Sequence, residues 1–335
     1  MAISLLEMTF DELASAVTDM GQPSYRADQL TDWVYGKGVT DPARMSNLPR
    51  RLLDAFDILT SQVSSSQVSD DGTSKLLIAL ADGHHVEAVL IPDRQRATAC
   101  LSTQVGCAMR CSFCASGLGG LQRNCSSGEM LQQLLHLQNS CRTKVTNVVF
   151  MGMGEPLANY DQTVRAIEAL TDLKRFGISA RKITVSTIGL PDRIRQLSRL
   201  REPFTLAISL HAPNDQLRGK LIPEASSVPI RQIISAAREF YESRHREITL
   251  EYLLLSGVND SLNCAEELAE ISSQLRCNVN LIPYNPVPEL PYDRPSPITV
   301  KAFADRLSKK GVNVHIRRPR GVDIAAACGQ LRRSP

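Results

Sequence analysis

Three cysteines with the spacing C-x3-C-x2-C are the residues whose types and spacing most directly indicate chemistry: Cys107, Cys111 and Cys114. Thiolates are soft ligands, so the group favours a zinc or an iron–sulfur site. A structural zinc site usually takes four ligands from two pairs, and no fourth Cys or His is close enough here to complete a second pair. Chance clustering of buried thiols is the remaining alternative, expected in roughly one chain in a hundred at this cysteine content.

The spacing favours an iron–sulfur cluster over zinc. Three thiolates on a [4Fe–4S] cluster leave one iron open, and that iron can hold a small molecule through its own donor atoms. Aromatic Phe113 stands immediately before Cys114. The resulting pattern, C-x3-C-x-Φ-C with Φ aromatic, resembles the signature of radical S-adenosylmethionine (SAM) enzymes.

The composition is that of a globular protein. Of 335 residues, 43% are hydrophobic and 22% charged, which is enough for a sizeable core in one large domain with an appendage or in two domains. The net charge of +3 permits a nucleic-acid partner without requiring one. No apolar run is long enough to span a bilayer, and the first residues are acidic where a signal peptide is basic. We therefore expect a cytoplasmic protein whose nine cysteines are ligands, catalysts or buried thiols rather than disulfides.

The periodicity predicts three parts: a helical accessory domain over residues 1–60, a β-hairpin extension over 61–99 and a core over 100–335. Basic side chains in the first part form either a solvated face or a surface for RNA phosphates. The hairpin has strand-like runs at 75–80 and 86–91. Glu87 lies in the second run, where simple alternation favours a solvent-facing side chain.

Strand-like and helix-like segments alternate in the core. Strands are predicted over 147–151, 182–186, 204–210, 248–255, 279–283 and 312–317, and helices over 161–173, 191–200, 229–242, 261–275 and 298–310. Repeated β–α units imply a parallel sheet with right-handed crossovers. With a strand near the cysteine loop the count is six or seven, too few for a closed eight-stranded barrel. The sequence therefore predicts an α/β fold, an open, partial (β/α)6 barrel.

Ligands of such folds lie at the carboxyl ends of the strands. Small or polar residues follow several predicted strands: Gly154, Glu155, Ser186, Ser209, Leu210, His211 and Asn285. Each is a weak signal alone, since a serine after a strand is often a helix cap. Their occurrence after successive strands, beside the cysteine loop, favours a pocket for a ligand with an amino acid end, a ribose and an adenine.

A fourth notable cysteine, Cys328, lies among small residues near the C-terminus. Five arginines are close to it in the sequence: Arg317, Arg318, Arg320, Arg332 and Arg333. Cationic surroundings favour a reactive thiolate, while a buried structural thiol is an equal alternative. The other cysteines, Cys125, Cys141, Cys264 and Cys277, follow no pattern and are expected to be buried or incidental.

Seven stretches carry a resemblance to a known family: RADQ at 26–29, VE at 86–87, residues 100–114, NVVFMGMGEPL at 147–157, LAISLHAPND at 206–215, NLIPYNP at 280–286 and AACGQL at 326–331. Together they resemble the RlmN/Cfr family of radical SAM RNA methyltransferases, over essentially the whole chain. One departure is Ala325, where the family commonly has Asp.

The resemblance implies a set of residue roles. Cys107, Cys111 and Cys114 match the ligands of a [4Fe–4S] cluster, and Gly154, Glu155, Ser186, Ser209, Leu210, His211 and Asn285 match positions that hold SAM. Cys328 matches a cysteine that is methylated by one SAM, loses a hydrogen atom to a radical made from a second SAM, and adds to an adenine carbon. Cys100 matches the cysteine that releases the product through a transient disulfide with Cys328, and Glu87 matches a proton acceptor.

The resemblance also implies substrates and partners. RlmN-like members methylate C2 of an adenosine in 23S rRNA, and many also act on tRNA, whereas Cfr-like members methylate C8 of the same rRNA adenosine. Val105, Pro156 and residues 211–215 favour C2, while 157–159 and 186–189 are closer to the C8 pattern. A flavodoxin-type electron donor and a monomeric state are further expectations.

Two other classes are alternatives. A radical SAM enzyme with a different substrate would have no need of Cys100 and Cys328, and both are present. A non-enzymatic metal-cluster RNA-binding protein would have no use for a SAM pocket at the strand ends. Both alternatives are therefore disfavoured.

Overall fold

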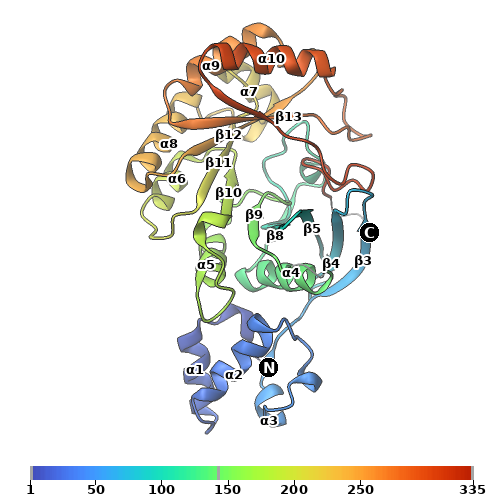
Figure 1. Ribbon diagram of the computed structural model, residues 1–335, viewed down its shortest axis with the longest axis vertical. Coiled ribbons are helices and arrows are strands. Elements are labelled where there is room, and N and C mark those ends of the chain that lie inside the picture. Colours follow the sequence, from blue (N-terminus) through green and yellow to red (C-terminus); the bar gives the residue numbers. More distant parts are fainter. Residues whose placement is uncertain (1–2, 142–143, 333–335) are drawn as a thin grey trace.

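The computed structural model describes residues 3–141 and 144–332. A group of short helices near the N-terminus forms one end of the molecule, and a curved sheet with its covering helices forms the other (Figure 1). No helix in the described ranges is both long enough and apolar enough to cross a membrane.

The N-terminal end is built from short helical elements. They are η1 (Leu5–Glu7), α1 (Phe10–Asp19), α2 (Tyr25–Thr31), η2 (Asp32–Gly36), η3 (Pro42–Arg44) and α3 (Arg50–Leu53). Helix α1 begins at a capping box, in which Glu12 N donates to Thr9 Oγ1 at 3.2 Å and Thr9 N donates to Glu12 Oε2 at 2.7 Å. Strand β1 (Ile3–Ser4) pairs in parallel with β2 (Phe56–Asp57) and closes this part of the chain.

One ten-stranded sheet organises the rest, in the order β14-β13-β12-β11-β10-β9-β6-β5-β4-β3. Its parallel strands are β6 (Arg96–Cys100), β9 (Asn147–Phe150), β10 (Ile183–Thr187), β11 (Thr205–Ser209), β12 (Ile248–Leu254), β13 (Cys277–Pro283) and β14 (Asn313–Ile316). The antiparallel strands β3 (Gln62–Val68), β4 (Ser74–Ala79) and β5 (His85–Asp93) extend the sheet beyond β6. Strands β3 and β14 are opposite edges, so the barrel is open, as predicted.

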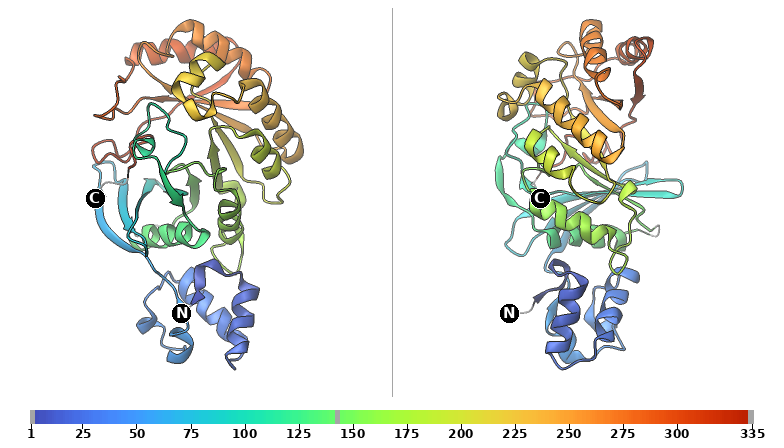
Figure 2. Two further views of the ribbon diagram at one scale, coloured as in Figure 1. Left: turned by 180° about the vertical axis from the view of Figure 1, so that it is seen from behind. Right: turned by 90° about the vertical axis from the view of Figure 1, so that its left-hand side faces the viewer.

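Helices connect the parallel strands: α4 (Ser127–Asn139), α5 (Tyr160–Thr171), α6 (Pro191–Leu197), α7 (Asp215–Leu221), α8 (Ile230–Arg244), α9 (Leu262–Ser272) and α10 (Pro297–Lys309). Helices α6, α8, α9 and α10 follow the convex outer side of the sheet (Figures 1 and 2). The six β–α units from β6 to α10, within the described residues, confirm the predicted partial (β/α)6 barrel. Predicted core strands agree to within two residues at each end, and predicted helices to within three.

Two core helices escaped prediction. Helix α4 buries Ser127, Gly128, Gln132 and Gln133 as well as leucines, so its apolar periodicity is weak. Helix α7 has only seven residues and buries a charged one, Arg218. Helix propensity and hydrophobic periodicity predict a helix poorly when the buried face of the helix is polar.

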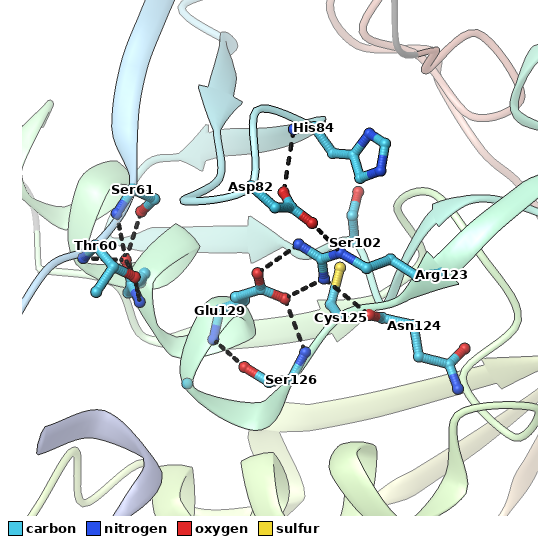
Figure 3. Close-up of polar contacts among 12 residues, drawn as sticks. Thr60, Ser61, Asp82, His84, Ser102, Arg123, Asn124, Cys125, Ser126 and Glu129 are labelled. Carbon is cyan, nitrogen blue, oxygen red and sulfur yellow. Dashed lines mark hydrogen bonds and ion pairs between the residues drawn. The ribbon is translucent and has the colours of Figure 1, made fainter. Parts of the chain in front are cut away.

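Arg123 fixes the base of the cysteine loop. The loop leaves β7 (Gln104–Gly106) and returns in β8 (Leu121–Asn124), which pair with each other. Arg123 donates two hydrogen bonds of 2.8 Å to Glu129, at the start of α4, and one of 2.5 Å to Asp82, in the turn between β4 and β5 (Figure 3). This bond lowers the pKa of Asp82 to about 2. One guanidinium thus joins a hairpin, a turn and a helix N-terminus.

We expect Arg123→Met to lower the free energy of unfolding by about 1–3 kcal/mol, because it breaks charge-assisted hydrogen bonds to two carboxylates. Urea denaturation at neutral pH measures the loss. Since the pKa of Asp82 is lower in the folded than in the unfolded chain, its share of the stability is present above about pH 4 and disappears as the pH falls toward 2. Arg50→Met, which removes a well-exposed ion pair with Asp54, is the control. Equal stability losses in the two variants would contradict the prediction.

Candidate active site

A cavity at the carboxyl ends of the parallel strands contains most of the predicted site residues. Cys107, Cys111, Cys114, Gly154, Glu155, Ser186, Ser209, His211 and Cys328 all line it. They come from the cysteine loop, from the ends of β9, β10 and β11, and from the C-terminal segment. The sheet topology therefore brings together residues more than 200 positions apart.

Backbone contacts hold the cysteine loop over this cavity. Cys107 N donates to Gly120 O at 3.3 Å across the base of the loop, Ser112 N donates to Leu221 O at the end of α7, and Ala115 N donates to Gly329 O beside Cys328. Within the described residues, no three Cys, His, Asp or Glu side chains are close enough to hold a single metal ion. The three thiols stand around the cavity without converging on one point.

The three thiols are poor acids in these surroundings. Burial is the main cause, and it raises the pKa of Cys107 to about 12 and that of Cys111 and Cys114 above the ordinary range. The charges of neighbouring thiols and of Glu155 raise the pKa of Cys111 further. Thiolates here need a compensating positive charge, which a metal cluster supplies. Soft, half-buried, grouped donors of this kind fit a [4Fe–4S] cluster.

Glu155 is a buried carboxylate that joins two strand ends. Its Oε1 accepts from Leu157 N at 2.9 Å, and its Oε2 accepts from Ile188 N, just beyond β10, at 2.8 Å. Burial raises the pKa of Glu155, and this effect is larger than that of the hydrogen bonds, which lower the pKa. Gly154 has φ +100°, and a Cβ there would lie 2.6 Å from Gln104 Cβ, so only glycine fits. The carboxylate remains open to a cationic ligand from the cavity side.

His211 and two serines also line this cavity. Ser186 Oγ and Ser209 Oγ are 3.2 Å apart and can share a hydroxyl proton or bind a ligand hydroxyl. His211 Nδ1 accepts from Leu253 N at 3.1 Å, which assigns the ring proton to Nε2. Burial lowers the pKa of His211 to about 3, so the ring is neutral. Its backbone is in the left-handed region, with φ +58°, an uncommon conformation that often marks a functional site.

Two predicted SAM contacts do not line this cavity. Leu210 is fully buried, and its backbone N donates to Glu251 O at 3.0 Å. Asn285 lines a second, adjoining cavity, and its Nδ2 donates to Cys328 O at 3.3 Å. Leu210 thus belongs to the main hydrophobic core, and Asn285 contacts the backbone of Cys328.

Cys328 stands where the two cavities meet. Cys100, Asn285, Arg317, Arg318 and Arg320 line the second cavity, and Cys328, Arg317, Met151 and Ile282 line both. Burial, together with the charge of Cys328, raises the pKa of Cys100 to about 12. The charge of Cys328 also raises the pKa of Arg317, which marks Arg317 as the cation beside both cysteines. Of the five arginines noted in the sequence, Arg333 lies outside the described residues.

Glu87 differs from the expectation of a solvent-facing residue. It is only 3% exposed, because β5 is covered on both faces. It lines neither cavity. Its carboxylate pairs with Lys75 at 2.9 Å and accepts from Arg332 N at 2.7 Å.

Two buried charged residues near the cavity escaped sequence analysis. Glu251, on β12, lines the first cavity. Its Oε2 is 3.6 Å from Arg317 Nη1 and accepts no hydrogen bond from the part of the chain that the structure describes. Arg218, on α7, is fully buried and donates to the carbonyl oxygens of Ile188, Ala225 and Val228. Glu251 could have been found from the sequence, because it is a charged residue inside the apolar strand ITLEYLL. The other cysteines, Cys125, Cys141, Cys264 and Cys277, line neither cavity.

The fold and the site define a radical SAM enzyme, and comparison with known proteins agrees. Residues 101–268 match the model of the radical SAM superfamily. Residues 3–57 match the model described as the ribosomal RNA large subunit methyltransferase N-terminal domain. The first region lies in the partial (β/α)6 barrel, and the second covers the N-terminal helices.

Full-length relatives narrow the class. A protein of Synechocystis sp. named "Probable dual-specificity RNA methyltransferase RlmN" is 45% identical over 98% of this chain and 95% of its own. A protein of the same name from Alkaliphilus metalliredigens is 43% identical over 99% of this chain. The crystal structure of a radical SAM methyltransferase from Sphaerobacter thermophilus superimposes with a TM-score of 0.96 at 42% identity, over 99% of this chain and all of that one. The chain belongs to the RlmN family of radical SAM RNA methyltransferases and, with that family, uses a [4Fe–4S] cluster and SAM.

We expect Gly154→Ala to weaken SAM binding at least tenfold, because the new Cβ meets Gln104 and displaces the segment that carries Glu155. Equilibrium dialysis of the cluster-loaded protein with SAM measures the affinity. Gly83→Ala is the matched control, since Gly83 also has a positive φ, of +84°, but its Cβ would meet nothing within 4 Å. Unchanged SAM affinity in a folded Gly154→Ala protein would show that this segment does not contact SAM.

Proposed function

We propose that this enzyme methylates C2 of an adenosine in 23S rRNA and also acts on tRNA, with Cys328 as the carrier of the methyl group. The position of Cys328 carries the proposal. One cavity beside it holds the grouped thiols and the strand-end polar residues, and the other holds Cys100 and a set of arginines. A group on Cys328 can therefore face either a cofactor or a nucleic acid substrate.

We assign the cluster to Cys107, Cys111 and Cys114, and SAM to the wall formed by Gly154, Glu155, Ser186, Ser209 and His211. Glu155 would accept hydrogen bonds from the ammonium of SAM, and the serines and neutral His211 would hold its hydroxyls or ring nitrogens. When bound, the reduced cluster and SAM supply a 5′-deoxyadenosyl radical. The apolar lining of this cavity, including Phe150, Ile188 and Leu253, would shield the radical from water.

Cys328 has two tasks in this proposal. Its thiolate would first take the methyl group of one SAM by polar displacement, which leaves S-adenosylhomocysteine, and the guanidinium of Arg317 lines the same two cavities as Cys328. After a hydrogen atom is removed from that methyl group, the carbon adds to adenine, whose ring carbons are too electron-poor to take a methyl from SAM directly. Cys100, which also lines the second cavity, would then attack the sulfur of Cys328: the sulfur–carbon bond breaks, a Cys100–Cys328 disulfide forms and the methyl carbon takes up a proton. The one electron left over from the radical addition would pass back to the oxidised cluster. Glu87 is retained as the proposed proton acceptor.

The second cavity suits a nucleotide. Arg318 and Arg320 at its rim can contact phosphates, and the buried Oδ1 of Asn285 has no partner within the described residues and can accept from an exocyclic amino group. The electron donor of the reaction is expected to be a flavodoxin-type protein, and the enzyme to act as a monomer. C8 methylation of the same adenosine is the alternative outcome.

A product assay with Cys328→Ala tests the function. Reconstituted enzyme, SAM, reductant and unmodified 23S rRNA fragment or tRNA are incubated without oxygen, and nucleosides are compared with 2-methyladenosine and 8-methyladenosine by mass spectrometry. We expect 2-methyladenosine from the native enzyme and none from Cys328→Ala, which still cleaves SAM to 5′-deoxyadenosine because the cluster ligands are intact. Cys264→Ala, away from both cavities, is the control.

Each other outcome of this assay has a definite meaning. Formation of 8-methyladenosine would agree with the proposed radical chemistry but would show that the methylated position is C8 and not C2. Methylation by the Cys328→Ala variant would show that Cys328 does not carry the methyl group. Cleavage of SAM without any methylated nucleoside from the native enzyme would reject both RNA substrates.

We propose further that the helical accessory domain, residues 1–60, contacts the RNA backbone. Arg44 and Arg51 are exposed and have no ion pair within the described residues, unlike Arg50, which pairs with Asp54. Arg44 ends η3 and Arg51 lies on α3, and the N-terminal helices that include α3 form the end of the molecule opposite α10 (Figure 1).

We expect the double variant Arg44→Gln/Arg51→Gln to bind RNA more weakly and to reduce the slope of log K against log salt concentration by about 1–2, because two phosphate contacts are lost. Filter binding at several salt concentrations measures the slope. Lys309→Gln/Lys310→Gln removes two exposed charges at the opposite end and should leave the slope unchanged. Equal effects of the two double variants would mean that binding follows net charge and not this surface.

A further inference from the structure

A buried ion pair lies between the hairpin and the C-terminal segment. Lys75 on β4 and Glu87 on β5 are diagonal neighbours on one face of the sheet, since Leu77 pairs with Glu87 and Lys75 with Val89. Lys75 Nζ is 2.9 Å from Glu87 Oε1, and the side chains are 11% and 4% exposed. Neither the sequence motifs nor the comparisons assign a role to Lys75.

Both members of the pair also bind the segment that carries Cys328. Lys75 Nζ donates to Ala325 O at 3.3 Å, three residues before Cys328. Arg332 N, four residues after it, donates to Glu87 Oε2 at 2.7 Å. One ion pair therefore holds the two ends of residues 325–332. In Figures 1 and 2 the C-terminal segment lies beside the ends of the antiparallel strands.

This segment depends on such contacts because it has no helix or strand of its own. Between the two ends, Ala115 N donates to Gly329 O at 2.8 Å and Ser116 Oγ donates to Leu331 O at 2.7 Å, which ties the segment to the cysteine loop. Ala325 has φ +50°, a left-handed conformation that alanine adopts only at a cost. The bond from Lys75 to the carbonyl of the same residue helps to hold it there.

A buried pair is a weak source of net stability, since desolvation of two charges offsets their attraction. A buried ion pair can instead fix the relative position of two chain segments, provided that both charged groups have hydrogen-bond partners. Here both oxygens of Glu87 and the ammonium of Lys75 have partners. Removal of Lys75 leaves Glu87 buried without its counter-ion and Ala325 O without its donor.

We propose that Lys75 is a positioning residue for the methyl-transfer reaction: paired with Glu87, it clamps residues 325–332 so that Cys328 stays at the junction of the two cavities. The inference rests on the proposed role of Cys328.

Hydrogen exchange, followed by mass spectrometry on the cluster-loaded enzyme without oxygen, tests the clamp. We expect Lys75→Met to raise the exchange rates of the Ala326 and Arg332 amides about tenfold, because both lie at the clamped ends of the segment. Lys75→Arg should restore slow exchange, since a guanidinium can donate to both Glu87 and Ala325. Lys301→Met, which removes a surface pair with Asp305 on α10, is the control and should leave both rates unchanged.

A second readout separates positioning from a general loss of structure. A displaced Cys328 should uncouple the reaction, so we expect the ratio of 5′-deoxyadenosine formed to RNA methylated to rise several-fold in Lys75→Met and to return with Lys75→Arg. Partial unfolding would lower both products together. If Lys75→Met does not fold, Lys75→Met/Glu87→Gln removes both buried charges and is expected to show fast exchange at Ala326.

The inference fails if a folded Lys75→Met protein exchanges both amides at the native rate, if exchange rises equally in α10, or if Lys75→Arg does not restore slow exchange. Failure of the proposed function is distinguishable. Methylation by Cys328→Ala would reject the carrier, while the exchange result would still decide whether Lys75 clamps this segment.

Discussion

One fully buried serine joins the three segments on which the site depends. Ser102 Oγ donates to Glu87 O on β5 at 2.6 Å and accepts from Met153 N, beyond β9, at 2.8 Å. Its backbone N and O bond to the Gln133 side chain of α4 at 2.8 and 2.9 Å. Because Ser102 lies between Cys100 and Cys107, this network fixes where the cysteine loop leaves the sheet. A Cβ on Gly152 would lie 2.6 Å from Ser102 Oγ, so the fit leaves no room for a larger residue.

The same stretch of chain sets the spacing between the cysteine loop and the strand-end residues. Thr103 N donates to Met153 O at 2.9 Å, and Glu155 N donates to Gln104 Oε1 at 2.9 Å. The backbone after β6 thus runs beside the backbone after β9, and Glu155 reaches across to Ile188 beyond β10. Buried polar groups that all have partners specify a single arrangement. The cavity is therefore shaped by side chains that never face it, such as Ser102 and Gln133.

This dependence explains which features the sequence could predict. Alternating strands and helices recur along the chain, and the carboxyl ends of parallel strands must meet, so Gly154, Ser186, Ser209 and His211 could be placed in one site from their positions alone. Long-range polar pairing leaves no such local pattern. The burial of Glu87 results from the C-terminal segment packing on β5, and α4 stayed hidden because glutamines occupy its buried face. The exclusion of Leu210 and Asn285 from the first cavity likewise depends on side-chain directions that spacing does not determine.

Burial gives the site its electrostatic character. It raises the pKa of all three clustered thiols and of Glu155, and lowers that of His211 to about 3, so burial shifts each of these groups toward its neutral form. A cluster bound by these thiols would reverse the shift for them alone, because its positive irons would stabilise thiolates and release their protons. Arg218 is buried near Cys111 and Glu155, and its hydrogen-bond acceptors within the described residues are carbonyl oxygens, so it would face the new negative charge. Arg218 is thus a positive charge already in place for the negative charge that cluster binding would create. His211, being neutral, contributes no positive charge.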